Sequence, residues 1–358
     1  MSLVIDADAH VIEGAAFARE ALARWPDRVQ LVRAPDGTPY FAIEGRRYPN
    51  ASGPGAGCPP EHGLTRAAGD PSTPAGMLAD ADREGIDRMV LFPSLALGVA
   101  GFTDLGFAAD FARVYNRWIA DTCAQGGGRL SAAAVVPLAD VDASVAILRE
   151  ARALGLVCAV VPPALRDRNL DHPELDRFYA AATDLDCPLG VHGAPGVHLP
   201  QIGVDRFTNY VQVHCVSFPF DQMAAMTALL SGGVFERHPR LRVAFLEAGA
   251  TWVPYFLDRL HEHQEKRGDW LPGGWKRDPR DAVASGNVWV SCEPGETLLP
   301  AVVDALGPDA LLYASDYPHW DSEFPDSVRA LRERSDLPAG AREKILGANA
   351  ARFFGLAG

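Results

Sequence analysis

Short apolar runs rich in Val, Ile, Leu and Ala recur along the chain, and each is followed by a longer stretch with a different apolar spacing. Continuous apolar runs of this length are typical of strands buried on both faces of a parallel sheet. The longer stretches have the helical period, as Phe107, Phe111 and Val114 show. The pattern therefore predicts an α/β protein in which strands alternate with helices. The eight predicted strands cover residues 3–11, 89–93, 132–138, 157–161, 188–192, 242–247, 288–292 and 311–315.

Eight strand–helix units are what a closed (β/α)8 TIM barrel contains, and we predict this fold. An open, doubly wound parallel sheet is the alternative that the alternation leaves open. Because a barrel uses about 250 residues and tolerates insertions, we interpret residues 1–358 as a single domain.

Residues 14–75, between the first two predicted strands, are too long for an ordinary connection. Residues 30–33 and 40–48 predict a β-hairpin with Asp36-Gly37 at its turn, and residues 51–60 form a loop rich in Gly and Pro. The segment leaves the C-terminal end of a strand, where barrel active sites lie. We therefore expect a lid-like insertion over the mouth of the barrel.

Composition and charge exclude several kinds of partner. Lys and Arg number 33 against 46 Asp and Glu, a formal net charge of −13, which disfavours nucleic acids and anionic membranes. The six cysteines stand singly, which is typical of neither a zinc knuckle nor a disulfide framework. The sequence also lacks the common nucleotide-binding, serine-hydrolase and HExxH motifs. Without a basic leader or a long apolar run, we expect a cytoplasmic protein.

Asp6, Asp8 and His10 occupy alternate positions of the first predicted strand, VIDADAHV. Side chains alternate between the faces of a strand, so we expect all three to point into the barrel. Two buried carboxylates need a cationic partner, since each is costly to bury unpaired. A metal ion would meet this need. The alternative is an arginine paired with Asp6 and a histidine that only packs in the core.

Three other strands end in residues that can bind a metal. His192 ends the fifth, Glu247 ends the sixth and Asp316 follows the eighth. Because the C-terminal ends of barrel strands meet at one mouth, these residues and the first strand predict a metal site there.

The same residues lie in three distinctive segments, VIDADAHVIE, HPRLRVAFLEAGATWVPYFLDRL and YASDYPHWDSEFP. These segments resemble the amidohydrolase-related family, in the branch of aminocarboxymuconate semialdehyde decarboxylase and the resorcylate-type decarboxylases. The resemblance covers most of the chain and implies a distorted (β/α)8 barrel with one divalent metal, usually zinc or manganese. Residue by residue, it implies Asp8, His10, His192 and Asp316 as the metal ligands.

The sixth-strand position departs from this family pattern. The family commonly has a histidine there that acts as general acid or base, whereas this chain has Glu247. A carboxylate can act as a base or bind a metal, but it does not change charge near pH 7 unless its pKa is raised. We therefore predict Asp316, Glu247 and His214 as catalytic residues, with Glu247 also a candidate metal ligand. His214 is the replacement acid or base, and a packing role is its alternative.

Further polar residues could enter the mouth. We predict Arg46, Arg47, His319 and Glu293 as substrate-binding residues, with the hairpin arginines clamping a carboxylate and His319 also orienting the eighth-strand aspartate. The alternative for Glu13 and Glu293 is that they support the metal ligands or are solvated loop charges. The alternative for the two arginines is a solvated arm of the hairpin. The surplus of carboxylates favours manganese, iron or magnesium over a histidine-rich zinc site, and it could accommodate two ions.

We predict a metal-dependent hydrolase or decarboxylase that acts on a C–C or C–N bond next to a carboxylate or carbonyl of a small aromatic or cyclic organic acid. Two alternatives stay open. The surplus of acids would suit a carboxylate-rich iron or di-iron oxygenase, and the imperfect ligand set would suit a metal-free small-molecule-binding relative. A homodimer is expected, since most soluble oligomers are twofold.

Overall fold

The computed structural model describes residues 3–35, 37–50, 56–57 and 66–356. Its central sheet contains the strands β1 (Ile5–Val11), β5 (Arg88–Pro93), β6 (Leu130–Val135), β7 (Cys158–Val161), β8 (Leu189–Val191), β9 (Val243–Phe245), β10 (Val288–Cys292) and β11 (Leu311–Tyr313). Each strand pairs in parallel with the next along the chain, in the order β1-β5-β6-β7-β8-β9-β10-β11. All eight predicted strands are therefore present.

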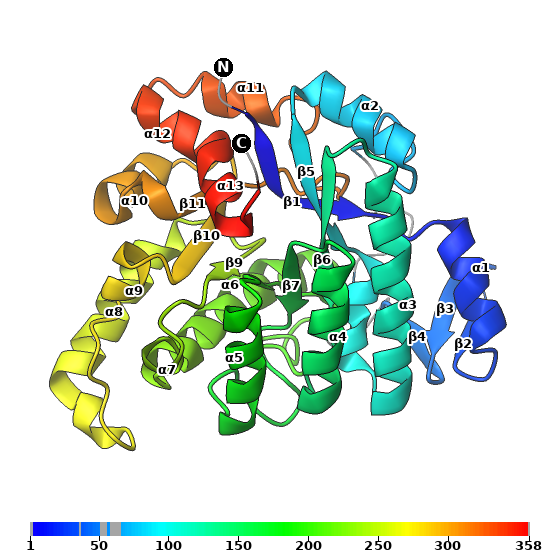
Figure 1. The fold of residues 1–358 in the computed structure, drawn as a ribbon, viewed down its shortest axis with the longest axis horizontal. Coiled ribbons are helices and arrows are strands. Elements are labelled where there is room, and N and C mark those ends of the chain that lie inside the picture. Colours follow the sequence, from blue (N-terminus) through cyan, green and yellow to red (C-terminus); the bar gives the residue numbers. More distant parts are fainter. Residues whose placement is uncertain (1–2, 36, 51–55, 58–65, 357–358) are drawn as a thin grey trace.

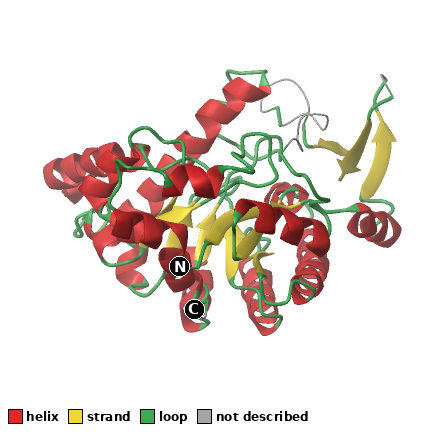
Figure 2. Cartoon of the chain, turned by 90° about the horizontal axis from the view of Figure 1, so that it is seen from above, coloured by secondary structure: helices red, strands yellow, loops and turns green. Residues whose placement is uncertain are grey.

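The two edge strands of this sheet are joined through residues at and beyond their ends. The amide of His10 donates to the carbonyl of Tyr317 at 2.6 Å, and the amide of Asp316 donates to the carbonyl of Asp8 at 3.0 Å. The sheet thus closes into a distorted barrel, and helices surround it in both overall views (Figures 1 and 2). This confirms the (β/α)8 fold rather than an open sheet.

The helices are α1 (Ala15–Arg24), α2 (Pro74–Glu84), α3 (Leu105–Ala124), α4 (Val141–Ala153), α5 (Asp176–Asp184), α6 (Tyr210–Ser231), α7 (Val234–Arg237), α8 (Trp252–Arg267), α9 (Asp281–Ala284), α10 (Leu299–Leu306), α11 (Ser327–Arg332), α12 (Ala339–Glu343) and α13 (Asn349–Phe354). Side-chain caps begin several of them: Asp104 accepts from the amide of Phe107 in α3, and Asp140 from that of Ala143 in α4. None of the helices within the described ranges is long and apolar enough to cross a membrane.

The predicted hairpin is present as a small antiparallel sheet of β2 (Val29–Arg33), β3 (Pro39–Ile43) and β4 (Arg46–Tyr48). Residues 40–48 contain two strands because Glu44 (φ 50°) and Gly45 (φ 73°) form a tight turn between them. Helix α1, which precedes the sheet, was not predicted. Asp36 and most of the loop 51–60 lie outside the described residues. The small sheet stands at the edge of the barrel (Figure 2).

Three strands end before the polar residues that were assigned to their tips. His192, Glu247 and Asp316 follow β8, β9 and β11 instead of ending them. Glu247 (φ 54°) and Asp316 (φ 52°) have left-handed backbone, which cannot continue a strand. The side chains therefore project from loops anchored at strand ends, at the mouth of the barrel.

Candidate metal centre

Strand β1 brings Asp8 and His10 to the mouth. A β-bulge lies between Asp6 and Ala9, where β1 has one residue more than β5, and bulges change the direction of side chains. Asp6 accepts hydrogen bonds from the amide and the hydroxyl of Ser315 instead of joining Asp8 and His10. Asp6 is buried as well and also accepts from the amide of Asp8 at 3.2 Å, so it lies beside the cluster without joining it.

Four side chains from β1 and from the loops after β8 and β11 form one cluster. Nε2 of His10 lies 3.3 Å from Nε2 of His192 and 3.3 Å from Oδ1 of Asp316. Oδ1 of Asp8 lies 3.7 Å from Nε2 of His10 and 3.9 Å from Nε2 of His192. Ligand atoms bound to one ion at about 2.1 Å lie roughly 3–4 Å apart, so the spacing of Asp8, His10 and His192 fits a divalent cation, and Asp316 adjoins this group through His10.

Hydrogen bonds determine which nitrogen of each histidine faces the cluster. Nδ1 of His10 donates to the carbonyl of Pro93 at 3.0 Å, and Nδ1 of His192 donates to that of Gly193 at 2.6 Å. In a neutral His10, Nε2 then presents its lone pair to the cluster, where it can bind a cation. Both carboxylate oxygens of Asp8 are buried without a hydrogen-bond partner. The donor set therefore fits a metal ion.

Burial also shifts the titration of these groups. It raises the pKa of Asp8 to about 8, even though His192 favours the charged form. Burial lowers the pKa of His10 well below its usual value, and the nearby imidazoles of His319 and His192 lower it further. A neutral His10 is the form that binds a metal, and a cation would offset the cost of an ionised Asp8.

Asp316 is held by one neighbour and is free on one side. Its Oδ1 accepts a hydrogen bond from Nδ1 of His319 at 2.8 Å, and Nε2 of His319 lies 3.1 Å from the hydroxyl of Ser94. Its Oδ2 is buried without a partner. Burial and the charges of Glu247 and Asp321 raise its pKa well above the usual range. His319 thus orients Asp316, as expected from the sequence.

Residues 5–356 match the model of the family described as Amidohydrolase. The chain belongs to this amidohydrolase family. It is 26% identical over 253 residues to a 2-amino-3-carboxymuconate-6-semialdehyde decarboxylase from Dictyostelium discoideum, a match that covers 70% of this chain and 67% of the relative. It is 28% identical over 297 residues to a gamma-resorcylate decarboxylase from Rhizobium sp., covering 77% of this chain and 85% of the relative.

A solved structure of a dihydroxybenzoic acid decarboxylase from Polaromonas sp., described with bound manganese and an inhibitor, has the same fold. Its TM-score is 0.69 at 18% identity, and the match covers 99% of this chain and 98% of that one. The barrel of this amidohydrolase is thus shared with solved structures over its whole length.

Glu247 is where this chain departs from the pattern implied by the resemblance. Its Oε2 lies 2.8 Å from Nε2 of His192, and its Oε1 lies 3.4 Å from Nε2 of His214, which projects from α6. Burial opposes protonation of His214, but its hydrogen bond to Glu247 and the charge of that carboxylate outweigh burial and raise its pKa. The structure therefore brings Glu247 and His214 together beside the four-residue cluster.

A cavity of about 470 Å³ lies next to the cluster, and it is lined by neighbours of the four clustered residues and not by those residues themselves. Its walls include Glu247 and His319 and, from the mouth loops, Ser94, Tyr210, Trp320 and Asp321. The small sheet and the residue after it contribute Leu31, Pro39, Tyr40, Phe41, Tyr48 and Pro49. The insertion thus forms one wall of the large cavity, and its role as a lid stays a prediction.

The predicted arginine clamp is not formed. Arg46 donates to the carboxylate of Glu44 at 3.1 Å and to the carbonyl of Gly101 at 2.9 Å. The guanidinium of Arg47 stacks on the ring of Tyr40 at 4.6 Å. Neither arginine lines the large cavity.

The two additional glutamates have different surroundings. The carboxylate of Glu13 accepts from the amides of Leu95 and Ala96 at 2.8 and 2.9 Å, so it holds the loop after β5, the supporting role considered as its alternative. Glu293 is exposed beside a smaller pocket at the mouth. Its role in substrate binding stays a prediction.

Sequence reasoning assigned no role to Asp321 or Ser94. Oδ2 of Asp321 lies 3.8 Å from Nε2 of His214, and Ser94 contacts His319 as described above. A signal existed for both, since Ser94 directly follows β5 and Asp321 lies in the segment SDYPHWDS. Neither position indicates which residue it meets, because the partners come from distant parts of the chain.

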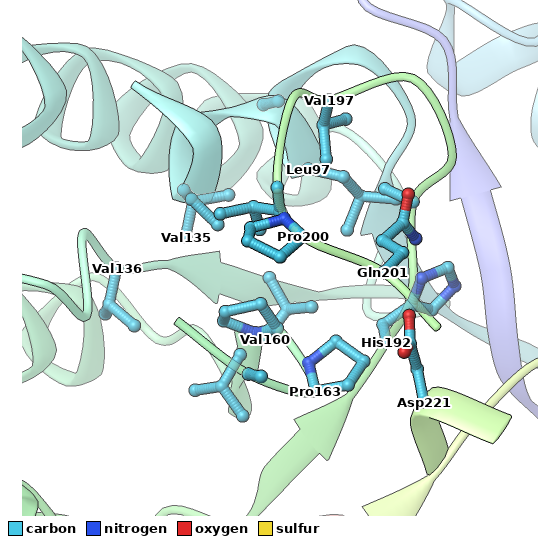
Figure 3. Close-up of a pocket in the computed structure, with 17 residues that line it drawn as sticks. Leu97, Val135, Val136, Val160, Pro163, His192, Val197, Pro200, Gln201 and Asp221 are labelled. Carbon is cyan, nitrogen blue, oxygen red and sulfur yellow. The ribbon is translucent and has the colours of Figure 1, made fainter. Parts of the chain in front are cut away.

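A second, small cavity of about 30 Å³ lies on the other side of His192, between the ends of β6 and β7 and the loop after β8 (Figure 3). Its lining is mostly apolar, but Gln201 and Asp221 enter it (Figure 3). Asp221 is 7% exposed and accepts a hydrogen bond from the amide of Ile202 at 2.9 Å. The space suits a water molecule and is too small for a substrate.

Proposed function

We propose that this protein is a metal-dependent decarboxylase of a small aromatic acid. The observation that carries the proposal is the cluster of Asp8, His10, His192 and Asp316, beside a largely apolar cavity whose wall includes their neighbours Glu247 and His319. The two curated relatives are named as decarboxylases. Hydrolysis was predicted from the sequence as an equal possibility, and the relatives favour the carboxy-lyase.

The four clustered residues would hold one divalent ion. We propose manganese, because two carboxylates and two imidazoles suit it and a structural relative is described with it, and zinc is the second choice. Such an ion, when bound, polarises substrate oxygens and offsets developing negative charge. The ring of Phe92 forms an apolar floor, 5.9 Å from the ring of His192 and 6.3 Å from that of His10. This floor keeps water from one side of the ligands.

Decarboxylation breaks the bond between a ring carbon and the carboxyl group, releases CO₂ and leaves a proton on that carbon. We assign this proton to Oδ2 of Asp316. His319 holds the other oxygen of Asp316, whereas Oδ2 has no partner. Glu247 is less available, because His192 and His214 engage both of its oxygens. His319, on the cavity wall, orients the proton carrier.

The cavity indicates how the substrate is received. Tyr40, Phe41 and Trp320 offer ring faces to an aromatic acid. Among the described residues that line it there is no lysine or arginine. The substrate carboxylate is therefore directed to the metal cluster, and an apolar body fills the remaining space.

The test measures metal content by elemental analysis and CO₂ release from 2,6-dihydroxybenzoate, with Asp8→Asn, Asp316→Asn and the exposed control Asp184→Asn. We expect Asp8→Asn to lose both the metal and activity. Asp316→Asn should keep most of the metal, since an amide oxygen can still bind, and lose at least about 100-fold in turnover, the usual contribution of a general acid. The control should match the wild type.

Unchanged metal content and CO₂ release in Asp8→Asn would contradict the proposal. Metal-loaded protein that hydrolyses amides of aromatic acids without releasing CO₂ would shift the assignment to a hydrolase. The relatives do not favour the iron oxygenase, and the unpartnered carboxylate of Asp8 opposes a metal-free binding protein. The homodimer and the cytoplasmic location stay predictions.

A further inference from the structure

Three side chains next to the four-residue cluster form a second set of potential metal ligands: His214 from α6, Glu247 after β9 and Asp321 after β11. Nε2 of His214 lies 3.4 Å from Oε1 of Glu247 and 3.8 Å from Oδ2 of Asp321. One ligand atom from each of the three lies within 4.8 Å of the others. The two separations from His214 are those of atoms that share one ion at about 2.1 Å.

The two oxygens of Glu247 face different sets. Oε2 lies 2.8 Å from Nε2 of His192, in the first cluster, and Oε1 faces His214, in the second. A carboxylate with one oxygen in each set has the geometry of a bridging ligand, as in two-metal sites with ions about 3.5–4 Å apart. The left-handed backbone of Glu247, φ 54°, holds the carboxylate between them.

A separate cavity of about 40 Å³ lies beside this second set. Its walls include His214, Glu247, Asp321, Asp316 and Glu293. The space is large enough for an ion with a water molecule, and its polar walls carry mainly acceptor atoms.

The charge around this cavity is unbalanced. Five carboxylates lie at or beside the two sets, those of Asp8, Glu247, Asp316, Asp321 and Glu293. Within the described part of the chain, their ion pairs are with histidines alone. One divalent ion in the first cluster would leave the carboxylates of Glu247 and Asp321 with histidine partners alone, at a cost in a partly dehydrated site. A second cation removes much of that cost.

We propose that a second divalent cation binds between His214, Glu247 and Asp321, and that Glu247 bridges it to the ion of the first cluster. The proposal rests on the proposed function for the first ion only. It assigns His214 as a ligand, in place of the general acid predicted from the sequence. One imidazole among carboxylates favours manganese or iron over zinc.

The test reconstitutes the full-length, chelator-treated protein with manganese chloride alone. Bound manganese per chain is measured by equilibrium dialysis, and low-temperature electron paramagnetic resonance reports whether two ions are magnetically coupled. We expect about two ions per chain and a coupled spectrum in the wild type. His214→Phe and Asp321→Asn should each bind about one ion with an uncoupled six-line spectrum, and the controls His263→Phe and Asp336→Asn should keep two. Because Asp321 is exposed, Asp321→Asn serves as the test if His214→Phe misfolds.

One manganese per chain in the wild type, unaffected by Asp321→Asn, would overturn the second site and leave the first standing. Two ions that persist in both variants would overturn it as well, since the second ion would lie elsewhere. A wild type that binds none would remove the first site, and with it the proposed function. The outcomes thus separate the two proposals.

Discussion

Two residues at the metal centre have a backbone that their side chains disfavour. Glu247 and Asp316 both have positive φ, although neither is a glycine, and such conformations cost about 1 kcal/mol or more each. The amide of Asp316 donates to the carbonyl of Asp8, and the amide of Glu247 donates to the hydroxyl of Ser291. These bonds hold both conformations. At the scale of single residues, the strained backbone of Glu247 and Asp316 thus directs both carboxylates toward the mouth of the barrel.

Asp221 carries a prediction about stability. Burial raises its pKa to about 6, although the amide of Ile202 and the side chain of Gln201 favour the charged form. An unfolded aspartate titrates near about 3.9. The folded state therefore holds this proton more tightly, so the stability that it contributes is complete below about pH 4 and is lost as the pH rises to about 6.

We expect Asp221→Asn to remove this loss, because asparagine still accepts from Ile202 and carries no charge to bury. For each protein, we compare the free energy of unfolding at pH 7 with its value at pH 4. This change should be more favourable in the variant than in the wild type by up to about 3 kcal/mol. Urea unfolding of both proteins, kept metal-free throughout, measures this difference. Parallel pH profiles would contradict the assignment.

At the scale of elements, the small sheet β2–β4 forms one wall of the large cavity but is fastened to a loop. The hydroxyl of Tyr48 donates to the carbonyl of Val197 at 3.3 Å, and Nε2 of His198 donates to the carbonyl of Arg47 at 2.8 Å. These partners lie in the loop after β8. Because this sheet is held by contacts with a loop, moving it away from the cavity costs less free energy than opening the barrel. Such a movement would let a substrate enter.

Phe41→Ala tests this wall. Phe41 lines the cavity far from the proton carrier, so its contacts act equally on bound substrate and transition state. We expect KM for a dihydroxybenzoate to rise about tenfold, with kcat within about twofold. The exposed Arg33→Ala on β2 is the matched control. A loss of kcat at unchanged KM would place Phe41 in the catalytic machinery instead.

At the scale of the whole molecule, the metal cluster joins the beginning and the end of the barrel. Asp8 and His10 come from β1, and Asp316 follows β11, the last strand. The amide hydrogen bonds between these segments close the barrel. The C-terminal helix α13 also lies beside β1 (Figure 1). A bound ion therefore stabilises the closure as well as the site.

Removal of metal should lower the thermal stability of the protein. At free metal 100 times its Kd, binding contributes about 2.7 kcal/mol, so we expect a chelator to lower Tm by about 5 °C. Calorimetry with manganese or with chelator measures this, and hydrogen exchange should locate the loss of protection in β1 and residues 313–319. Asp8→Asn should show no response. An equal Tm with and without chelator in the wild type would contradict a structural role of the ion.

The alternation of apolar runs and helical spacing was enough to predict the barrel and all eight of its strands. Burial on both faces makes parallel strands continuously apolar, which is a local signal. Asp8, His10, His192 and Asp316 were likewise identifiable, because strand ends of a barrel converge on one mouth. The hairpin was readable from alternation and turn residues, but α1 and the third strand β4 were not.

Contacts between distant segments were decided only by tertiary structure. The bulge in β1 separates Asp6 from Asp8, the partners on the insertion turn Arg46 away from the cavity, and Glu247 meets His214 through the placement of α6. Local sequence determines which residues form a strand or a helix, since periodicity is set by the backbone within a few residues. Which side chains share a cavity depends on how those elements pack, and that is a property of the whole chain.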